Sequence, residues 1–306
     1  MNTTEQVNTK TTTSGGAATC RFCGTGLQHT FVDLGMSPPC ETILEQAQLN
    51  QVEAFYPLHV YVCDRCFLVQ LQEYVTPENI FTEYAYFSSY SDSWLSHAKN
   101  YTTAMIDRFK LGRESQVVEL ASNDGYLLQY FVQAGVPVLG IEPAANVAKV
   151  ATGKGVPTLV KFFGAELAEE LALKGMKADL LLGNNVLAQV PDLRSFVKGM
   201  KILLKPTGVI TLEFPHLMRL MEENQFDTIY HEHFSYFSFL TTEKIMEEFG
   251  LTVFDVEEIP THGGSLRVYA RHKEDTTHPI TDRAKELTER EMKAGFTRLE
   301  TYFSFA

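Results

Sequence analysis

Short apolar runs alternate with amphipathic segments over the middle and later parts of the chain. The runs have the length of buried strands, and the segments between them carry apolar residues at helical spacing. The predicted strands are 116–120, 137–142, 158–160, 178–183 and 208–214, and the predicted helices are 124–134, one ending at Val150, 165–174, 193–204 and 242–249. This alternation predicts an α/β fold, with a doubly wound, Rossmann-like parallel sheet covered by helices on both faces.

Two further strand-like runs follow the last of these helices. Residues 251–258 and 264–271 have the pattern of a β-hairpin, which would add an antiparallel strand at one edge of the sheet. After them, residues 282–298 form a charged amphipathic segment, predicted to be a single helix without a cap or a partner.

The first third of the chain is organised differently. Residues 29–34 and 58–62 resemble short strands, and the spacing of His97, Tyr101, Met105 and Phe109 predicts a helix. We therefore expect five segments: a disordered tail 1–17, a small module 18–75, a helical and aromatic linker and lid 76–112, the sheet domain 113–272 and a C-terminal helical segment 273–306.

Aromatic side chains crowd into residues 84–94, where Tyr84 and Tyr86 are followed by further tyrosines and a tryptophan. This stretch can pack as a linker between two domains. It can equally form a lid over a ligand, because so many hydroxyl groups in a row are unusual in a core. The sequence leaves both alternatives open.

Composition restricts the class of protein. The chain has 306 residues, of which 44% are hydrophobic and 21% charged, as in ordinary globular proteins. No apolar run approaches the roughly 20 residues of a membrane span, and no signal peptide is evident, so we expect a cytoplasmic protein that is a monomer or a weak oligomer. The net charge of −12 argues against a nucleic-acid-binding protein.

Four of the five cysteines form two pairs in the small module. Cys20 and Cys23 are separated by two residues, as are Cys63 and Cys66. Each such pair can bind one tetrahedral metal ion, and together they predict a structural Zn²⁺ site with four thiolate ligands. A disulfide between the pairs is disfavoured in a reducing compartment. Cys40 is expected to be a free thiol in a loop.

The turn after the first predicted strand of the sheet has the character of a cofactor site. It contains Asn123, Asp124 and Gly125, and Glu142 ends the next strand, where it can bind two ribose hydroxyls. The turn lacks the glycine pattern that a pyrophosphate requires, and Asp124 would attract a sulfonium, so S-adenosylmethionine is favoured over NAD. The candidate cofactor-binding residues are Glu119, Ala121, Asn123, Asp124, Gly125, Glu142, Asn184 and Asn185.

Several motifs follow one another along the chain: Cys20-x-x-Cys23 with Cys63-x-x-Cys66, then 84–91, 119–125, 184–193, 230–233 and 262–267. Their order resembles that of a known family, the zinc-containing class I methyltransferases that C-methylate nucleotide-linked 4-keto-6-deoxysugars. The resemblance covers about residues 18 to 306. The chain departs from the family at Gln189, where the family usually carries a histidine, and it ends where the family's further α/β domain is expected to begin.

The resemblance implies a sugar-nucleotide substrate, dTDP-linked or linked to another nucleotide, that loses its C3 proton and is methylated as an enolate. His233 is the expected base, with Glu232 or Tyr230 orienting it or binding the sugar. Tyr230, His231 or Gln189 can donate to the oxyanion. The candidate catalytic residues are thus His233, Glu232, Tyr230 and His231, and the candidate substrate-binding residues are Tyr84, Tyr86, Gln189 and His262.

Simpler interpretations of the same residues stay open. His231 and His233 can be a hydrogen-bonded structural pair, or can form a metal site with His262. The protein can be an O- or N-methyltransferase of another small metabolite. It can also be a non-catalytic module in which the zinc domain and the sheet bind a partner.

Overall fold

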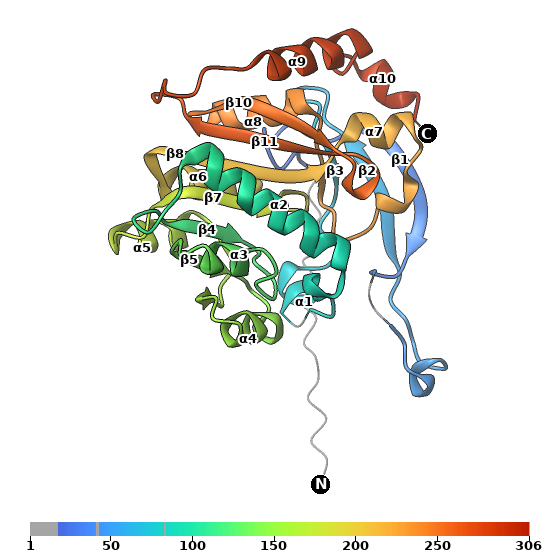
Figure 1. Ribbon diagram of the computed structural model, residues 1–306. Helices are drawn as coiled ribbons and strands as arrows, with labels where there is room; N and C mark the ends of the chain where they lie inside the picture. The colour runs from blue at the N-terminus through green and yellow to red at the C-terminus, as the bar shows by residue number, and fades with distance from the viewer. Residues whose placement is uncertain (1–17, 41–42, 83, 306) are drawn as a thin grey trace.

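The computed structural model describes residues 18–40, 43–82 and 84–305, so the predicted disordered tail 1–17 lies outside the described residues. The described chain forms two sheets (Figure 1). The larger is seven-stranded, with the strand order β10-β11-β8-β7-β4-β5-β6, and the smaller is four-stranded, with the order β1-β2-β3-β9.

The predicted parallel strands form the centre of the larger sheet. The apolar runs of the central strands are buried on both faces, as expected for parallel strands covered by helices, whereas the edge strand β6 is half-buried. The parallel strands are β4 (Val117–Leu120), β5 (Val138–Ile141), β6 (Thr158–Leu159), β7 (Ala178–Asn184) and β8 (Leu204–Pro215), and the antiparallel strands are β10 (Leu251–Ile259) and β11 (Ser265–His272). The hairpin is confirmed, but its second strand, β11, inserts antiparallel beside β8 and leaves β10 at the edge.

Helices cover the two faces of this sheet separately. Val118 and Leu120 of β4 pack in the same core as α5, α6 and α8, whereas Val117 packs with α2, α3 and α4 on the opposite face. The helices are α1 (Pro77–Phe81), α2 (Asp92–Phe109), α3 (Leu128–Gln133), α4 (Ala145–Gly153), α5 (Ala165–Leu173), α6 (Leu193–Leu203), α7 (Leu217–Glu222), α8 (Phe239–Glu248), α9 (Asp282–Ala294) and α10 (Leu299–Phe303). Short 3₁₀ turns lie at 46–48, 88–90, 187–189, 226–228 and 261–263.

The smaller sheet joins the cysteine module to a distant part of the chain. Its first three strands are β1 (His29–Ser37), β2 (Tyr56–Val62) and β3 (Val69–Leu71). The fourth, β9 (Ser235–Tyr236), closely follows residues 230–233, the histidine motif, and pairs Tyr236 with Val69. The sequence does not predict β9, because a run of two residues has no recognisable period.

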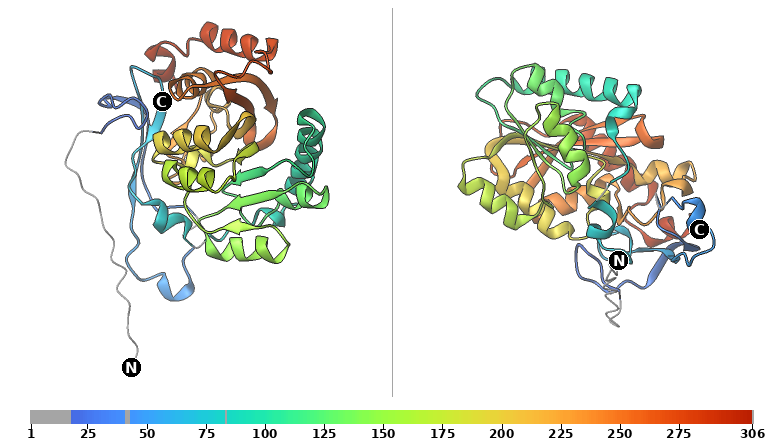
Figure 2. Two further views of the ribbon diagram at one scale, coloured as in Figure 1. Left: turned by 90° about the vertical axis from the view of Figure 1, so that its left-hand side faces the viewer. Right: turned by 90° about the horizontal axis from the view of Figure 1, so that it is seen from below.

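The C-terminal segment differs from the single helix predicted over 282–298. Gly295 adopts a φ of 90° and ends α9, and a separate helix, α10, follows it. Tyr302 of α10 stacks on Phe67 of the cysteine module at a ring distance of 5.8 Å. The segment therefore has both a cap and a partner, and Figure 2 shows it in red beside the blue module.

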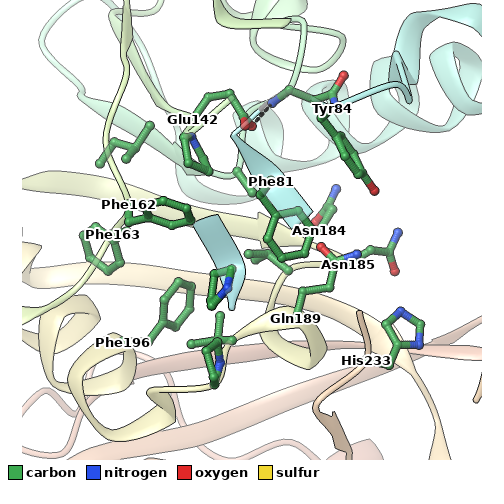
Figure 3. Close-up of a pocket in the computed structure, with 18 of the residues that line it drawn as sticks. Phe81, Tyr84, Glu142, Phe162, Phe163, Asn184, Asn185, Gln189, Phe196 and His233 are labelled. Atoms are coloured by element: carbon green, nitrogen blue, oxygen red, sulfur yellow. Dashed lines mark hydrogen bonds between the residues drawn. The ribbon is translucent and has the colours of Figure 1, made fainter. Parts of the chain in front are cut away.

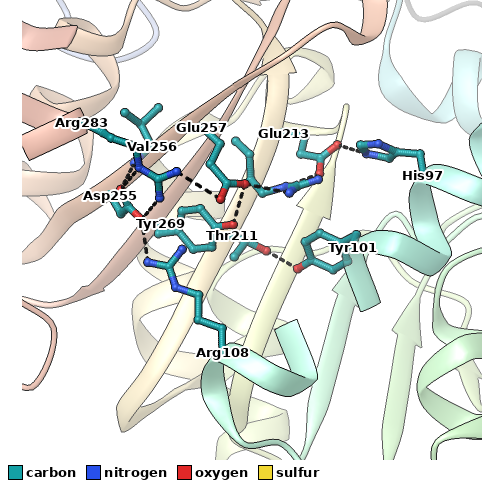
Figure 4. A network of polar contacts seen from close by, with 11 residues as sticks. His97, Tyr101, Arg108, Thr211, Glu213, Asp255, Val256, Glu257, Tyr269 and Arg283 are labelled. Atoms are coloured by element: carbon teal, nitrogen blue, oxygen red, sulfur yellow. Dashed lines mark hydrogen bonds and ion pairs between the residues drawn. The ribbon is translucent and has the colours of Figure 1, made fainter. Parts of the chain in front are cut away.

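A polar network fastens α2 to β8, β10 and β11 of the larger sheet (Figure 4). Glu213 of β8 accepts from Arg267 of β11 at 2.7 Å and contacts the His97 imidazole at 2.8 Å. These contacts hold the pKa of Glu213 below its usual range even though burial opposes them. Trp94 stacks on His97, so the network fixes the start of α2, which borders the cavity described below.

Across the described ranges of the chain, no helix is both long enough and apolar enough to cross a lipid bilayer.

Candidate active site

A cavity of about 870 Å³ lies beyond the carboxyl ends of the parallel strands (Figure 3). Ligands bind at this edge in doubly wound folds. The larger sheet, the cysteine module and the aromatic stretch before α2 all contribute to its wall. The predicted site residues that line it are Tyr84, Tyr86, Ala121, Asn123, Glu142, Asn184, Asn185, Gln189, Tyr230, His233 and His262.

The turn after β4 has an unusual backbone. Ala121, Asn123 and Gly125 have φ values of 55°, 48° and 74°, in the left-handed region that costs a non-glycine residue about 1–2 kcal/mol. Strain of this kind is retained where it serves a site. Here it directs the backbone N–H of Asn123 to Glu142 Oε2 at 2.8 Å.

Glu142 is fixed at the wall of the cavity. Its two carboxylate oxygens accept from the backbone N–H groups of Asn123, at 2.8 Å, and Ala144, at 2.9 Å. Burial raises the pKa of Glu142, and the two backbone hydrogen bonds oppose that rise. Each oxygen retains acceptor capacity, so this carboxylate can bind a pair of neighbouring hydroxyls.

Three predicted cofactor residues do not line the cavity. The Asp124 carboxylate forms an ion pair with Lys154 at 3.0 Å and accepts from the Ser89 hydroxyl, so it fastens the aromatic stretch rather than facing a sulfonium. A Cβ on Gly125 would lie 3.2 Å from the Ala151 Cβ, so this glycine allows α4 to pack closely. Burial, with repulsion from Glu142 and Asp124, holds the pKa of the Glu119 carboxyl well above its usual range.

The aromatic stretch forms part of the cavity wall. Tyr84, Tyr86, Ser88 and Trp94 all line the cavity. The backbone of Tyr84 exchanges two hydrogen bonds with the Asn146 amide, at 2.7 and 3.1 Å. The Ser88 N–H donates to Asn123 Oδ1 at 3.0 Å. These bonds attach the stretch to α4 and to the turn after β4.

His233 lies at the end of the cavity opposite the phenylalanines Phe162 and Phe163 (Figure 3). Its Nδ1 is 2.9 Å from the Thr228 carbonyl oxygen, which can only accept, so Nδ1 carries the proton. Nε2 therefore presents its lone pair, and accepts from the Tyr230 hydroxyl at 2.9 Å. Burial lowers the pKa of His233 to about 4, so the imidazole is neutral at physiological pH.

Glu232 and His231 point away from this cavity. The chain turns at 230–233, where the His233 N–H bonds the Tyr230 carbonyl at 3.0 Å, so Tyr230 and His233 share one side. Glu232 instead accepts from the Cys40 thiol at 3.0 Å, and His231 Nε2 donates to the Pro57 carbonyl at 3.2 Å. The Thr228 carbonyl, rather than Glu232, orients the His233 ring.

His262 and Gln189 line the same cavity. His262 packs edge-on against Trp94, with ring centroids 5.4 Å apart, and burial lowers the pKa of its imidazole. Within the described ranges, the only group of His, Cys, Asp and Glu side chains close enough to hold a metal ion is the cysteine cluster. The alternative metal site formed by His231, His233 and His262 is therefore not assembled.

The four cysteines converge as predicted. Their Sγ atoms all lie within 4.8 Å of one another, and Cys20–Cys66 and Cys23–Cys63 are each 3.5 Å apart. Zn–S bonds of about 2.3 Å in a tetrahedron place sulfurs about 3.8 Å apart, so the cluster fits Zn²⁺. Four thiolates leave no open position, as in a structural site.

Sequence reasoning missed two parts of the wall. Phe162, Phe163 and Phe196 gather at one end, where an aromatic ring could be sandwiched. Phe162 and Phe163 could have been predicted from their place in the sequence, because they follow the carboxyl end of β6, the edge at which ligands bind in this fold. The other part is Arg21, which lies between two zinc ligands and for which the sequence offered no signal.

Unpartnered buried polar atoms support a ligand in this cavity. Both polar atoms of the Asn184 amide, and Oδ1 of Asn185, lack a hydrogen-bond partner among the described residues. Buried polar groups in folded proteins are nearly always bonded, so these amides fit a polar ligand that would complete their hydrogen bonds.

Comparison with known proteins gives consistent matches along the chain. Residues 20–81 match a family described as "Putative zinc binding domain", residues 94–256 one described as "Methyltransferase domain", and residues 260–306 one described as "C-methyltransferase C-terminal domain". The curated "C-methyltransferase NovU" of Streptomyces niveus is 36% identical over 287 residues, which are 94% of this chain and 68% of that protein.

Two further similarities cover smaller parts of the chain or have lower sequence identity. A "Ubiquinone biosynthesis O-methyltransferase" of Bartonella bacilliformis is 31% identical over 99 residues, covering 31% of this chain and 39% of that protein. The crystal structure of the PH0226 protein from Pyrococcus horikoshii superposes with a TM-score of 0.50 and 16% identity, covering 66% of this chain and all of that one. The second match concerns the fold alone.

Proposed function

The chain belongs to the C-methyltransferase family, and on that premise we propose that it methylates C3 of a nucleotide-linked 4-keto-6-deoxysugar with S-adenosylmethionine as donor. The observation that carries the proposal is the neutral His233 imidazole, oriented by Thr228 and Tyr230 at one end of the cavity. O- and N-methylation need no C–H deprotonation, so removal of a carbon-bound proton separates this function from them.

The chain's residues fit S-adenosylmethionine, which supplies an electrophilic methyl group when bound. Glu142 binds the two ribose hydroxyls, and the Asn184 and Asn185 amides face the polar part of the molecule. The phenylalanines at the far end hold the flat adenine base. Zn²⁺ serves the cysteine module and takes no part in the reaction.

His233 performs the proton transfer. The ketone at C4 of the sugar acidifies the C3 proton, which passes to Nε2 of His233 once the Tyr230 hydroxyl turns from the ring. Negative charge then develops on the C4 oxygen. Gln189 and Tyr230 are the proposed donors to that oxygen, because both line the cavity, whereas His231 does not.

Product analysis tests this function. The protein is incubated with S-adenosylmethionine and a panel of ketosugar nucleotides, and the products are analysed by mass spectrometry and ¹³C NMR. We expect one added methyl group on a sugar carbon. A methyl group on oxygen or nitrogen, or no product with any member from protein that binds S-adenosylhomocysteine, would contradict the proposal.

Replacing Glu142 with glutamine is expected to weaken S-adenosylhomocysteine binding by about 10–100-fold. The amide loses the charge that strengthens hydrogen bonds to ribose hydroxyls, and its NH₂ group would confront the N–H of Asn123 or Ala144. Calorimetry measures the change. Glu289→Gln is the control, since Glu289 is exposed on α9, pairs only with Lys293 among the ion pairs of the described residues, and does not line the cavity. Equal affinities in the two variants would exclude Glu142 from the site.

The pH profile should reflect the burial of His233. A base must be unprotonated to act, and the pKa of this imidazole is lowered to about 4, so kcat/KM should stay nearly constant as pH falls from 7 to about 5. It should decline only as pH approaches the lowered pKa. Initial rates at saturating S-adenosylmethionine measure this, and a decline centred near pH 6.5 would show that the base is exposed to solvent.

A further inference from the structure

Arg21 connects the zinc-binding cysteines to the cavity. It lies between the ligands Cys20 and Cys23, yet its side chain lines the cavity. Its backbone N–H donates to Gln70 Oε1 at 2.9 Å, and the Gln70 amide donates to Cys20 Sγ at 3.2 Å. The cysteine cluster and the buried Gln70 therefore fix the position from which Arg21 extends.

The Arg21 guanidinium is held by neutral groups. Nη1 donates to the Pro191 carbonyl at 3.3 Å, and Nη2 donates to the Leu71 carbonyl. The cation also lies over the Phe234 ring, 5.5 Å from its centroid. Among the described residues no carboxylate lies within ion-pair distance of Arg21, and its Nε has no hydrogen-bond partner.

Arg21 lines the same cavity as His233 and contacts the residue next to that base. Phe234 directly follows the base His233, and its N–H bonds the carbonyl of Ala188, the neighbour of Gln189. Lys161, the other Lys or Arg of the cavity wall, pairs with Glu170 at 2.9 Å and adjoins the phenylalanine end. The described cavity wall thus contains two side chains with a guanidinium or ammonium group, Arg21 and Lys161. Of these two, only Arg21 has no carboxylate within ion-pair distance.

A largely enclosed cation is costly unless an anion contacts it. Glu73 lies on the same cavity wall and interacts electrostatically with Arg21, but it lies beyond ion-pair distance and leaves the contact position of the guanidinium open. Two of the five guanidinium N–H groups are used by carbonyls, which leaves donors for an incoming oxygen. We propose that Arg21 receives an oxyanion of the acceptor substrate, which makes it a further substrate-binding residue of the reaction. The inference rests on the proposed function.

Two oxygens of the acceptor have this chemistry. One is the enolate oxygen at C4, formed when His233 removes the C3 proton. The other is a phosphate oxygen of the nucleotide. Contact with the enolate is made only after proton removal and so affects kcat, whereas contact with phosphate exists in the ground state and affects KM.

The test compares Arg21→Gln and Arg21→Lys with Arg65→Gln. Arg65 is the matched control, because it lies between the other two zinc ligands but is exposed to solvent. All variants are assayed for zinc content and for kinetics with dTDP-4-keto-6-deoxyglucose. We expect R21Q to lower kcat/KM by about 10–150-fold, the loss of one hydrogen bond to a charged group. R21K should lose less, and R65Q should stay within about 2-fold of the wild type.

The kinetic split identifies the oxygen. A raised KM with weaker calorimetric binding of dTDP indicates phosphate, and a lowered kcat with unchanged dTDP binding indicates the enolate. R21Q with full zinc and kcat/KM within about 2-fold of the wild type would overturn the inference while the proposed function stands. If R21Q loses zinc, R21K with full zinc decides by the same criterion. A wild-type protein inactive on every ketosugar nucleotide would overturn the proposed function, and this inference with it.

Discussion

Replacing His233 with glutamine is expected to lower kcat for methyl transfer by about 10²–10⁴-fold, the usual contribution of a general base. Glutamine fills a similar volume and can still bond the Thr228 carbonyl and the Tyr230 hydroxyl, so the wall of the cavity should keep its shape. Steady-state kinetics with the ketosugar nucleotide measure the loss. Calorimetry with S-adenosylhomocysteine should show affinity within about 2-fold of the wild type, since His233 lies at the opposite end from the phenylalanines.

His231→Gln is the matched comparison for this variant. The His231 imidazole donates to the Pro57 carbonyl in the cysteine module and does not line the cavity. We therefore expect a lower melting temperature but nearly normal kcat for the folded protein. The account would be contradicted if H231Q lost catalysis and H233Q retained it, because the assignment of the base would then be reversed.

Loss of zinc is expected to have the largest effect on stability. Replacing Cys63 with serine removes one of four thiolates, and structural zinc sites contribute about 10–16 kcal/mol of apparent binding free energy at pH 7. The small module buries little apolar surface of its own, so it should unfold locally. Leu71 of that module bonds the Phe234 carbonyl, so the histidine motif should loosen with it.

Zinc analysis and hydrogen exchange measure this effect. The wild type should hold one zinc ion per chain and C63S none, with faster exchange over residues 18–74 and 230–237. Cys40→Ser is the control, because Cys40 lies outside the cluster and should leave the zinc content unchanged. Full protection of the module in zinc-free C63S would show that the metal is dispensable for its fold.

Features that depend on the local hydrophobic pattern or on residue spacing could be predicted from the sequence. The parallel strands of the larger sheet follow from apolar runs that are buried on both faces, as around Val118 and Leu181. The zinc cluster follows from the spacing of its cysteines, because two residues between thiolates suit one metal ion whatever the surrounding fold. The position of Glu142 at the end of β5 follows from the general geometry of doubly wound sheets.

Features that depend on tertiary contacts were not predictable. Asp124 was expected to face the cofactor, but Lys154 and Ser89, distant in sequence, bind its carboxylate instead. Either Glu232 or Tyr230 was expected to orient His233 or to bind the sugar. Tyr230 contacts the His233 ring, but the turn directs Glu232 to the Cys40 thiol. The pairing of β3 with β9 joins Gln70 to Ser235, which are more than 160 residues apart in the sequence. A local hydrophobic pattern cannot predict which distant strands pair.

Exchange of the C3 proton tests the central claim most directly. The protein is mixed in D₂O with dTDP-4-keto-6-deoxyglucose and S-adenosylhomocysteine, so that a proton can be removed but no methyl group can be transferred. We expect ¹H NMR to show loss of the C3 signal with the wild type and its retention with H233Q. Retention with a wild-type protein that binds S-adenosylhomocysteine, or equal exchange in both proteins, would contradict the claim that His233 generates a carbon nucleophile.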